Sequence, residues 1–588
     1  MRDRTLEGER TGSSGRWRAM APLVGIGACL LLAAAIINPF REMLSWDDGW
    51  AYARTVEHLI RTGEYQLDGW AAANMPVQVY LAGAASTIFG YSLSLVRLTT
   101  VGMLAVGLAS FYGLARELGA APRTSFAATL ALLASPLVLL LGFTFMSDVQ
   151  FLGWMLAALF LYVRGFRRGS DVLVFMGSVA AACAIGTRQF GLAIVVGLLV
   201  TWMLSRGEDR PRLRTISLAA ALPAGAVGWQ ILMGMTEPNF TEVVRLYEQR
   251  VYLGQPPALL AHEFLWRAAI VLQYVGISVL PALPLLVGAA LACAGKSRLK
   301  AKRLLLLAAL IGLALCAILL SGSPLTAPPD APPRRLWPPL GLEWLLPMLL
   351  RLSEYFALFG PIDLAGLAAA AALGAVALFS ARGLWPVRRN RPETILLVAT
   401  PAALLGLHMV YVQLNDTYIV PFVPFALLLL AVQNRGSSLT PRLAAASTGV
   451  SLTALLLVSF FIRADFAAQT TLWAAADRLT NAGVPAAEIL GGKQWMEYRG
   501  AFDDWLAAGK PGYEFRPSTR PGFDAFHEPF YEWLDGRWQH AAYRILDAPI
   551  SEPGWRLIAR DYYRGIAFKR HEVFTYQAIE PTKAFHRQ

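Results

Sequence analysis

Long apolar runs follow one another along most of this chain, and this feature constrains the fold more than any other. A helix needs roughly 20 consecutive apolar residues to cross the hydrocarbon core of a bilayer, and about thirteen segments qualify. They lie near residues 19–38, 94–115, 123–143, 149–165, 172–187, 190–205, 215–233, 265–293, 304–321, 356–380, 394–412, 418–433 and 442–462. With 56% hydrophobic and only 16% charged residues, the composition also departs from that of soluble domains. The sequence predicts an α-helical polytopic membrane protein.

Basic residues gather in short loops at alternate ends of these segments, which orients them. The clusters lie within residues 2–18, 116–123, 164–168, 206–214, 296–303, 382–391 and 435–442. Since cytoplasmic loops carry the excess of Lys and Arg, these ends are expected to be cytoplasmic. The topology has a cytoplasmic tail (1–18), a transmembrane domain (19–462) with a first outer loop at 39–93, and an extracytoplasmic domain (463–588). We expect a multi-pass protein of the plasma membrane, specifically a bacterial inner membrane. The first apolar run is expected to stay as a span, although AAA at 33–35 would also suit a cleaved signal peptide.

The net charge of +12 does not indicate a nucleic-acid partner. Residues 463–588 hold 16 basic and 16 acidic residues, so the whole excess lies in the membrane part, where topology explains it. All four cysteines fall in predicted spans and show neither a disulfide framework nor the spacing of a metal site. They are Cys29, Cys183, Cys293 and Cys316.

The first outer loop opens with SWDDGWAY (45–52), which places two carboxylates directly after an apolar run. On a helix from about Trp46 to Arg61, the polar residues fall on one arc and the apolar residues on the next. The polar arc holds Asp47, Arg54, His58 and Arg61, and the apolar arc holds Trp46, Trp50, Ala53, Val56 and Ile60. This pattern predicts a helix that lies on the membrane with its tryptophans at the depth of the headgroups.

A purely structural interpretation of SWDD remains open. Ser45 can be the N-cap of this helix, with Asp48 three residues later in a capping-box arrangement. A second helix is expected over 75–90, with Pro76 in its first turn and too few residues to span comfortably.

Two further charged groups lie at the outer ends of predicted spans. Asp148, in FTFMSDVQF, has no basic residue near it in sequence. An ionisable group at the edge of the hydrocarbon is costly unless it is paired or faces a wet cavity, so it is a functional candidate; the alternative is an N-cap formed with Ser147. Arg188, in GTRQFG beside Gln189, lies on the outer side against the charge rule and requires an anion. That anion is either a carboxylate such as Asp148 or a phosphate.

A third outer turn, HMVYVQLNDTYIVPF (408–422), supplies His408, Tyr411 and Tyr418 as possible substrate-lining residues, together with Arg54, His58 and Gln189. The alternative for His408 is a buried histidine with a structural hydrogen bond.

Beyond residue 463, the pattern predicts a small α/β domain. It has a helix over 468–482 that ends at Gly483 and strands at EILGG, YRILD, WRLIARDYY and EVFTYQ. Its many aromatic side chains could stack on sugars or form the core of the domain.

Taken together, these pieces resemble the glycosyltransferase C superfamily. They are most similar to its family 39-like, protein mannosyltransferase-related members. The matching pieces are the pair Asp47 and Asp48, PVQVYLAGAASTIFG before SLVRLTT, FMSDVQF, TRQFG, TYIVPFVPFALLLL, and LWAAADRLTNAGVPAAEILGGKQWMEYRG. The resemblance is weakest over 234–393. One departure is Thr417, which stands where many relatives carry an arginine before the tyrosine.

The resemblance implies a sugar donor carried on polyprenyl phosphate, a lipid, glycan or protein acceptor, and inversion at the anomeric carbon. Neighbouring residues on a helix point about 100° apart, so Asp47 and Asp48 cannot share a face. We expect Asp47 to act as general base and Asp48 to orient or cap. Asp148 is then the second carboxylate, and Arg188 holds the departing phosphate. No metal is expected, although the resemblance leaves a divalent ion open.

Other functions suit a chain with many spans. A transporter or lipid flippase would show repeated halves and charges at mid-membrane, whereas these ionisable residues gather at the outer ends. An O-antigen ligase or polymerase would concentrate its function in a large late outer loop. A non-catalytic scaffold would leave Asp148 and Arg188 unexplained.

Overall fold

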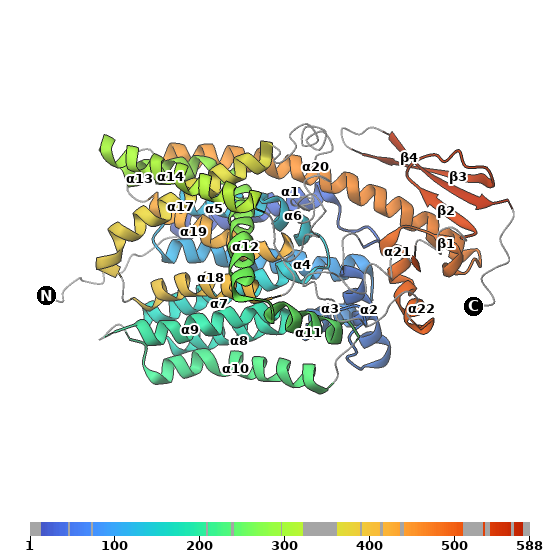
Figure 1. Cartoon of the computed structure of the whole chain (residues 1–588), viewed down its shortest axis with the longest axis horizontal. Helices are drawn as coiled ribbons and strands as arrows, with labels where there is room; N and C mark the ends of the chain where they lie inside the picture. The colour runs from blue at the N-terminus through green and yellow to red at the C-terminus, as the bar shows by residue number, and fades with distance from the viewer. Residues whose placement is uncertain are drawn as a thin grey trace.

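A computed structural model describes most of the chain as helices, with a small sheet near the C-terminus (Figure 1). The described residues are 13–44, 48–71, 75–206, 210–236, 240–295, 297–321, 361–388, 391–411, 416–434, 440–509, 533–534, 541–565 and 570–579. Most long helices run side by side along the long axis of the molecule, and the sheet lies beyond one end of this bundle.

The first half of the bundle and its outer loop contain ten helices within the described residues. They are α1 (Ser13–Ile37), α2 (Gly49–Thr62), α3 (Pro76–Phe89), α4 (Leu93–Glu117), α5 (Pro122–Ala134), α6 (Pro136–Gly142), α7 (Ser147–Arg168), α8 (Asp171–Thr187), α9 (Leu192–Leu204) and α10 (Leu213–Thr236). A single 3-10 turn, η1 (Gln189–Gly191), separates α8 from α9.

The second half continues with α11 (Phe240–Leu253), α12 (Pro257–Ser278), η3 (Leu280–Ala282), α13 (Leu283–Ala294), α14 (Arg298–Leu320), α17 (Pro361–Arg388), α18 (Pro392–Val410), η5 (Asp416–Phe422), α19 (Val423–Gln433) and α20 (Thr440–Asn481). The C-terminal domain adds η6 (Ala486–Glu488), β1 (Ile489–Leu490), α21 (Lys493–Tyr498), α22 (Ala501–Ala507), β2 (Tyr543–Leu546), β3 (Trp555–Arg564) and β4 (Arg570–Ala578).

The expected fold class, a helical membrane protein with a small C-terminal α/β domain, is confirmed. Every expected span falls on a helix or a bent helix pair to within a residue or two at its ends, apart from residues 356–360 and 412, which lie outside the described residues. By length and composition, seven described helices can cross a membrane, or up to nine if each of two bent pairs is one span. The remaining four segments are apolar helices of 10–17 residues. The number of thirteen spans therefore stays a prediction.

The four strands predicted in the C-terminal domain are all present, in the order β1-β2-β4-β3. Strands β2 and β3 both pair antiparallel with β4, while the short β1 pairs parallel with β2. The helix predicted over 468–482 is the last part of α20, which ends at Asn481 just before Gly483 in the left-handed region (φ 90°). This 42-residue helix runs without a break from the bundle to the sheet (Figure 1).

Helix α2 of the first outer loop packs against protein. Helix α2 begins at Gly49, not at Trp46, and ends at Gly63 (φ 78°). Most of its apolar arc is covered, since Trp50 is 1% exposed and Ala53 and Val56 are fully buried, while Ile60 near its end is exposed. The expected interfacial helix with Trp50 at headgroup depth is therefore wrong, because α3 and α21 pack on α2. The second expected helix is confirmed as α3, with Pro76 in its first turn.

A close helix crossing holds the second half of the bundle together. Helices α12 and α17 meet at Gly276 and Gly366, where a Cβ atom on Gly276 would collide with the carbonyl oxygen of Gly366. Small residues let membrane helices approach this closely, so that van der Waals contact can stabilise them.

We expect Gly276→Ala to destabilise the protein by about 1–3 kcal/mol, because the added methyl group forces two backbones apart. Thermal unfolding of the purified protein in detergent measures this change. The control is Gly406→Ala in α18, where a Cβ meets no atom within 4 Å. That substitution should leave the melting temperature unchanged or slightly raised, and an equal loss in both variants would contradict the close crossing.

Candidate functional site

The turn before α7 brings Asp148 to one end of the bundle. Helix α7 begins at Ser147, and its N-cap is Met146, which makes no side-chain capping bond. Asp148 is thus the second helical residue, where the positive end of the helix dipole favours a carboxylate. The alternative that Asp148 is an N-cap with Ser147 is wrong for this reason. The turn is held against α3 by the Gln78 amide, which donates to the carbonyl oxygen of Phe145 at 2.9 Å.

Asp148 and Arg188 form a buried ion pair. Arg188 follows α8 in an extended conformation, and its Nη1 donates to Oδ1 of Asp148. The Asp148 side chain is fully buried and that of Arg188 is 14% exposed. The hydroxyl of Thr417 also interacts with the carboxylate of Asp148. The pairing that the sequence offered as one of two alternatives for Arg188 is present.

Aromatic rings surround the guanidinium of Arg188. Its Cζ lies 4.7 Å from the ring centre of Tyr418 and 6.0 Å from that of Phe190. The imidazole of His408 stacks on Phe190 at 4.2 Å, and Tyr411 meets Phe190 edge-on at 5.7 Å. The structure therefore brings three of the predicted residues, His408, Tyr411 and Tyr418, to Arg188.

One ring nitrogen of His408 makes the structural hydrogen bond that is expected of a buried histidine. Its Nδ1 lies 2.7 Å from the carbonyl oxygen of Leu404, so Nδ1 carries the proton and donates. This is the ordinary bond of a buried histidine. The ring also interacts with the backbone of Tyr418. It is thus fixed in orientation.

Helix α2 adds a carboxylate and a tyrosine. Asp48 is the N-cap of α2 but makes no side-chain capping bond; its Oδ1 instead accepts a hydrogen bond from Trp70 Nε1 at 2.6 Å. The capping box with Ser45 as N-cap is therefore wrong, because the helix starts four residues later. One turn after Asp48, Tyr52 is buried and interacts electrostatically with Asp48, Asp148 and Arg188. Burial is the main reason that the pKa of Tyr52 lies well above its usual value.

Some predicted residues lie elsewhere or cannot be placed. Asp47, the expected general base, lies outside the described residues, so its role stays a prediction. Gln189 is exposed and His58 is half-buried on α2. Tyr52 was missed by sequence reasoning, although its position four residues after Asp48 on one helix could have revealed it.

A second buried arginine was also missed. Arg267, on α12, pairs with Glu263 at 2.7 Å, and the two side chains are 2% and 0% exposed. Its Nη1 also donates to the carbonyl oxygens of His408 and Tyr411. This arginine therefore fixes the end of α18, where the predicted residues lie. The i,i+4 spacing of Glu263 and Arg267 within an apolar segment was the available signal.

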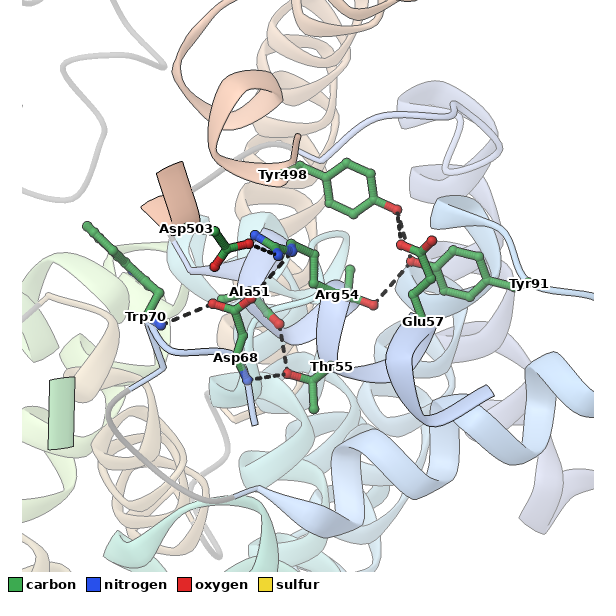
Figure 2. Close-up of polar contacts among 10 residues, drawn as sticks. Ala51, Arg54, Thr55, Glu57, Asp68, Trp70, Tyr91, Tyr498 and Asp503 are labelled. Atoms are coloured by element: carbon green, nitrogen blue, oxygen red, sulfur yellow. Dashed lines mark hydrogen bonds and ion pairs between the residues drawn. The ribbon is translucent and has the colours of Figure 1, made fainter. Parts of the chain in front are cut away.

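Arg54 points toward Asp503 of the C-terminal domain (Figure 2). Its Nε lies 3.4 Å from Oδ2 of Asp68, and its Nη2 pairs with Asp503 of α22. Burial raises the pKa of Asp68 to about 6, although Arg54 and the backbone N–H of Trp70 act to lower it. Arg54 is thus a bridge between the outer loop and the C-terminal domain.

The described residues contain no group of three or more His, Cys, Asp or Glu side chains that could hold a metal ion. Asp47 lies outside the described residues, so this statement does not cover a metal site formed by Asp47 and Asp48. The expectation of a metal-free reaction stays a prediction.

Comparison with known proteins adds three similar structures. ArnT from Cupriavidus metallidurans is 14% identical with a TM-score of 0.42, covering 95% of this chain and 98% of that one. The Archaeoglobus fulgidus oligosaccharyltransferase AglB, in complex with an inhibitory peptide and a dolichol-phosphate, is 13% identical with a TM-score of 0.44. That match covers 86% of this chain and 61% of AglB. The arabinofuranosyltransferase AftD from Mycobacteria is 14% identical with a TM-score of 0.37, covering 95% of this chain and 41% of AftD.

Two of these names are those of sugar-transferring enzymes. No protein-family model matches this chain, and no curated protein matches it in sequence. Since the TM-scores lie between 0.37 and 0.44, the function of this chain must be inferred from its own residues.

We expect Asp148→Asn and Arg188→Gln each to destabilise the protein by about 3–5 kcal/mol, because each leaves one buried charge unpaired. The double variant should lose less than the sum of the two, since it buries no lone charge. Thermal unfolding in detergent of all four proteins completes the cycle. Additive losses would contradict a direct pair.

The raised pKa of Asp68 predicts a pH-dependent stability. Its folded-state pKa of about 6 lies above the ordinary 3.8, so the folded state binds a proton more tightly than the unfolded state. The resulting stabilisation is fully present below pH 4 and is lost as the pH rises through 6. The melting temperature of the wild type minus that of Asp68→Asn should therefore increase as the pH falls from 7.5 to 4.5. A constant difference would contradict the raised pKa.

Proposed function

We propose that this chain is an integral membrane glycosyltransferase that moves a sugar from a polyprenyl phosphate donor to an acceptor on the extracytoplasmic face. The observation that carries the proposal is the buried Asp148–Arg188 pair beneath the first outer loop. A carboxylate and a guanidinium at the end of an apolar bundle suit a substrate with a polar headgroup and a lipid tail.

The reaction needs a base, a phosphate site and a carboxylate near the sugar. The acceptor oxygen bonds to the anomeric carbon from the face opposite the phosphate, so the configuration inverts. The anomeric carbon–oxygen bond to the phosphate breaks, and its electron pair leaves with polyprenyl phosphate. Asp47 takes the proton of the acceptor as general base. Asp48 orients this end of the helix, and Asp148 steers the acceptor or holds Arg188.

Arg188 supplies the positive charge for the leaving phosphate. A guanidinium carries five N–H donors, and the pair with Asp148 leaves others available for phosphate oxygens. In a water-poor site, such preorganised donors stabilise developing charge strongly. Thr417 lies next to Asp148 where relatives carry an arginine, which makes Arg188 the proposed phosphate ligand. His408, Tyr411 and Tyr418 line the same side.

The orientation follows from the charges of the loops, with a cytoplasmic N-terminus and an extracytoplasmic C-terminal domain. The proposed bacterial inner membrane rests on the resemblance of the outer domain to that of bacterial members. The acceptor is a lipid, a glycan or a protein, and the reaction needs no metal ion.

A transporter is the main alternative, since two helix pairs are bent by 66° and 55°. Transporter sites use such breaks to place charged groups at mid-membrane. The breaks here, Ser135 between α5 and α6 and residues 279–282 between α12 and α13, carry no ionisable side chain. This difference favours the transferase.

We expect purified wild-type protein in lipid vesicles to release free polyprenyl phosphate from one of a panel of polyprenyl phosphate sugars, offered with mixed membrane glycolipids. Asp47→Asn should lower turnover by at least about a hundredfold, since a general base contributes that much or more. Arg188→Lys should also lower turnover, because an ammonium cannot bind phosphate in a bidentate way.

The matched control is Asp171→Asn at the start of α8, a residue paired with Arg214 by 3.2 Å and far along the helix from Arg188. It should keep wild-type turnover. Equal turnover in Asp47→Asn and wild type would remove Asp47 as the base. ATP- or gradient-driven movement of intact donor without any release of polyprenyl phosphate would favour the flippase.

A further inference from the structure

The C-terminal domain touches the first outer loop through α21 and α22, on the side of α2 shown in Figure 2. The closest polar contacts come from Tyr498 and Asp503. Tyr498 donates from its hydroxyl to Oε2 of Glu57 at 3.0 Å, and Asp503 pairs with Arg54. Glu57 and Arg54 lie one turn apart on the same helix, so the domain holds α2 at two points.

The loop that follows α2 is tied into the same contact. Asp68 accepts from the backbone N–H of Trp70 at 3.0 Å, and its own N–H donates to the Thr55 hydroxyl at 3.1 Å. Arg54 therefore lies between a carboxylate of the outer loop and a carboxylate of the C-terminal domain (Figure 2).

Apolar packing supports these polar contacts. The ring of Trp70 meets the ring of Phe502 edge-on at 5.0 Å, and Phe502 stacks with Trp505 at 5.7 Å. Phe502 and Trp505 are fully buried, whereas the Asp503 side chain is 51% exposed. An exposed ion pair contributes little energy, so the rings supply most of the attraction and the ion pair sets the register.

Trp70 links this contact to the candidate site. Its indole N–H donates to Asp48 at 2.6 Å while its ring rests on Phe502. On α2 itself, Tyr52 lies toward Asp148 and Arg188 and interacts with Asp48, whereas Arg54 and Glu57 lie toward the C-terminal domain. A helix is stiff over one or two turns, so fixing one side of α2 fixes the other.

We infer that α21 and α22 are a positioning element of the site: Tyr498, Phe502 and Asp503 hold α2 and Trp70 so that Tyr52 faces the Asp148–Arg188 pair and Asp48 stays bonded to Trp70. The inference rests on the proposed function for its effect on turnover, but the placement of α2 can be measured without it. Arg54 and Trp70 are positioning residues in this arrangement and touch no substrate.

Asp503→Lys in the full-length protein tests the inference, because it places a cation beside Arg54. The exposed position of residue 503 lets the domain fold with either side chain. Phe502→Ala is the second variant and removes the contact with Trp70. The control is Asp561→Lys, which breaks the pair with Arg478 in the same domain without touching α2.

Two measurements are compared in lipid vesicles. Spin labels at Ile60→Cys on α2 and Val106→Cys on α4, both at exposed positions, report the distance between α2 and the bundle. The four native cysteines are replaced by serine for this purpose. Asp503→Lys and Phe502→Ala should broaden this distance distribution, while Asp561→Lys leaves it unchanged.

The second measurement is donor turnover. Asp503→Lys and Phe502→Ala should lower kcat by about tenfold to a hundredfold and change the donor KM less than twofold, as expected for misplaced groups.

An unchanged distance distribution in both variants would overturn the inference, and so would a broadened distribution with wild-type kcat. If no donor is turned over even by the wild type, the proposed function fails. The distance measurement then still decides whether α21 and α22 hold α2.

Discussion

The ion pair between Asp148 and Arg188 fixes where two packed helices, α7 and α8, meet the candidate site. A single charge at this depth is costly, so each group needs the other, and the pair sets how the start of α7 lies against the end of α8. The aromatic rings of Tyr418 and Phe190 then close around the guanidinium, which brings η5 and η1 to the same place. Three breaks in the helical pattern therefore converge at one point.

Arg267 is a second buried arginine that is paired with a carboxylate and holds neighbouring segments of the chain together. The guanidinium of Arg188 lies over the ring of Tyr418, and the rings of His408 and Tyr411 pack on Phe190 beside it. Arg267 instead donates to the backbone carbonyl oxygens of His408 and Tyr411. Each arginine has its own carboxylate partner. The end of α18 is thus held by one cation through its side chains and by another through its backbone, which leaves it little freedom to move.

Much of the fold could be predicted because hydrophobic patterns are local. The expected spans fall on helices, and the strands of the C-terminal domain lie in the segments that the sequence pattern predicts. The Asp148–Arg188 pair could also be anticipated, since an arginine on the outer side contradicts the charge rule and needs an anion. The surroundings of α2 could not, because Arg54 and its partner Asp503 are 449 residues apart. An apolar arc predicts burial, but it does not say whether lipid or a distant domain covers it.

The unbroken helix α20 constrains how this architecture can change in length. Its 42 residues connect the bundle to the sheet without a hinge, and α21 and α22 must still meet α2. Each inserted residue would turn everything beyond it by about 100° and carry it outward by about 1.5 Å. Only insertions or deletions of about one or two whole turns, such as seven residues, return the domain to nearly the same facing. Related chains should therefore vary in the length of this helix in steps rather than freely.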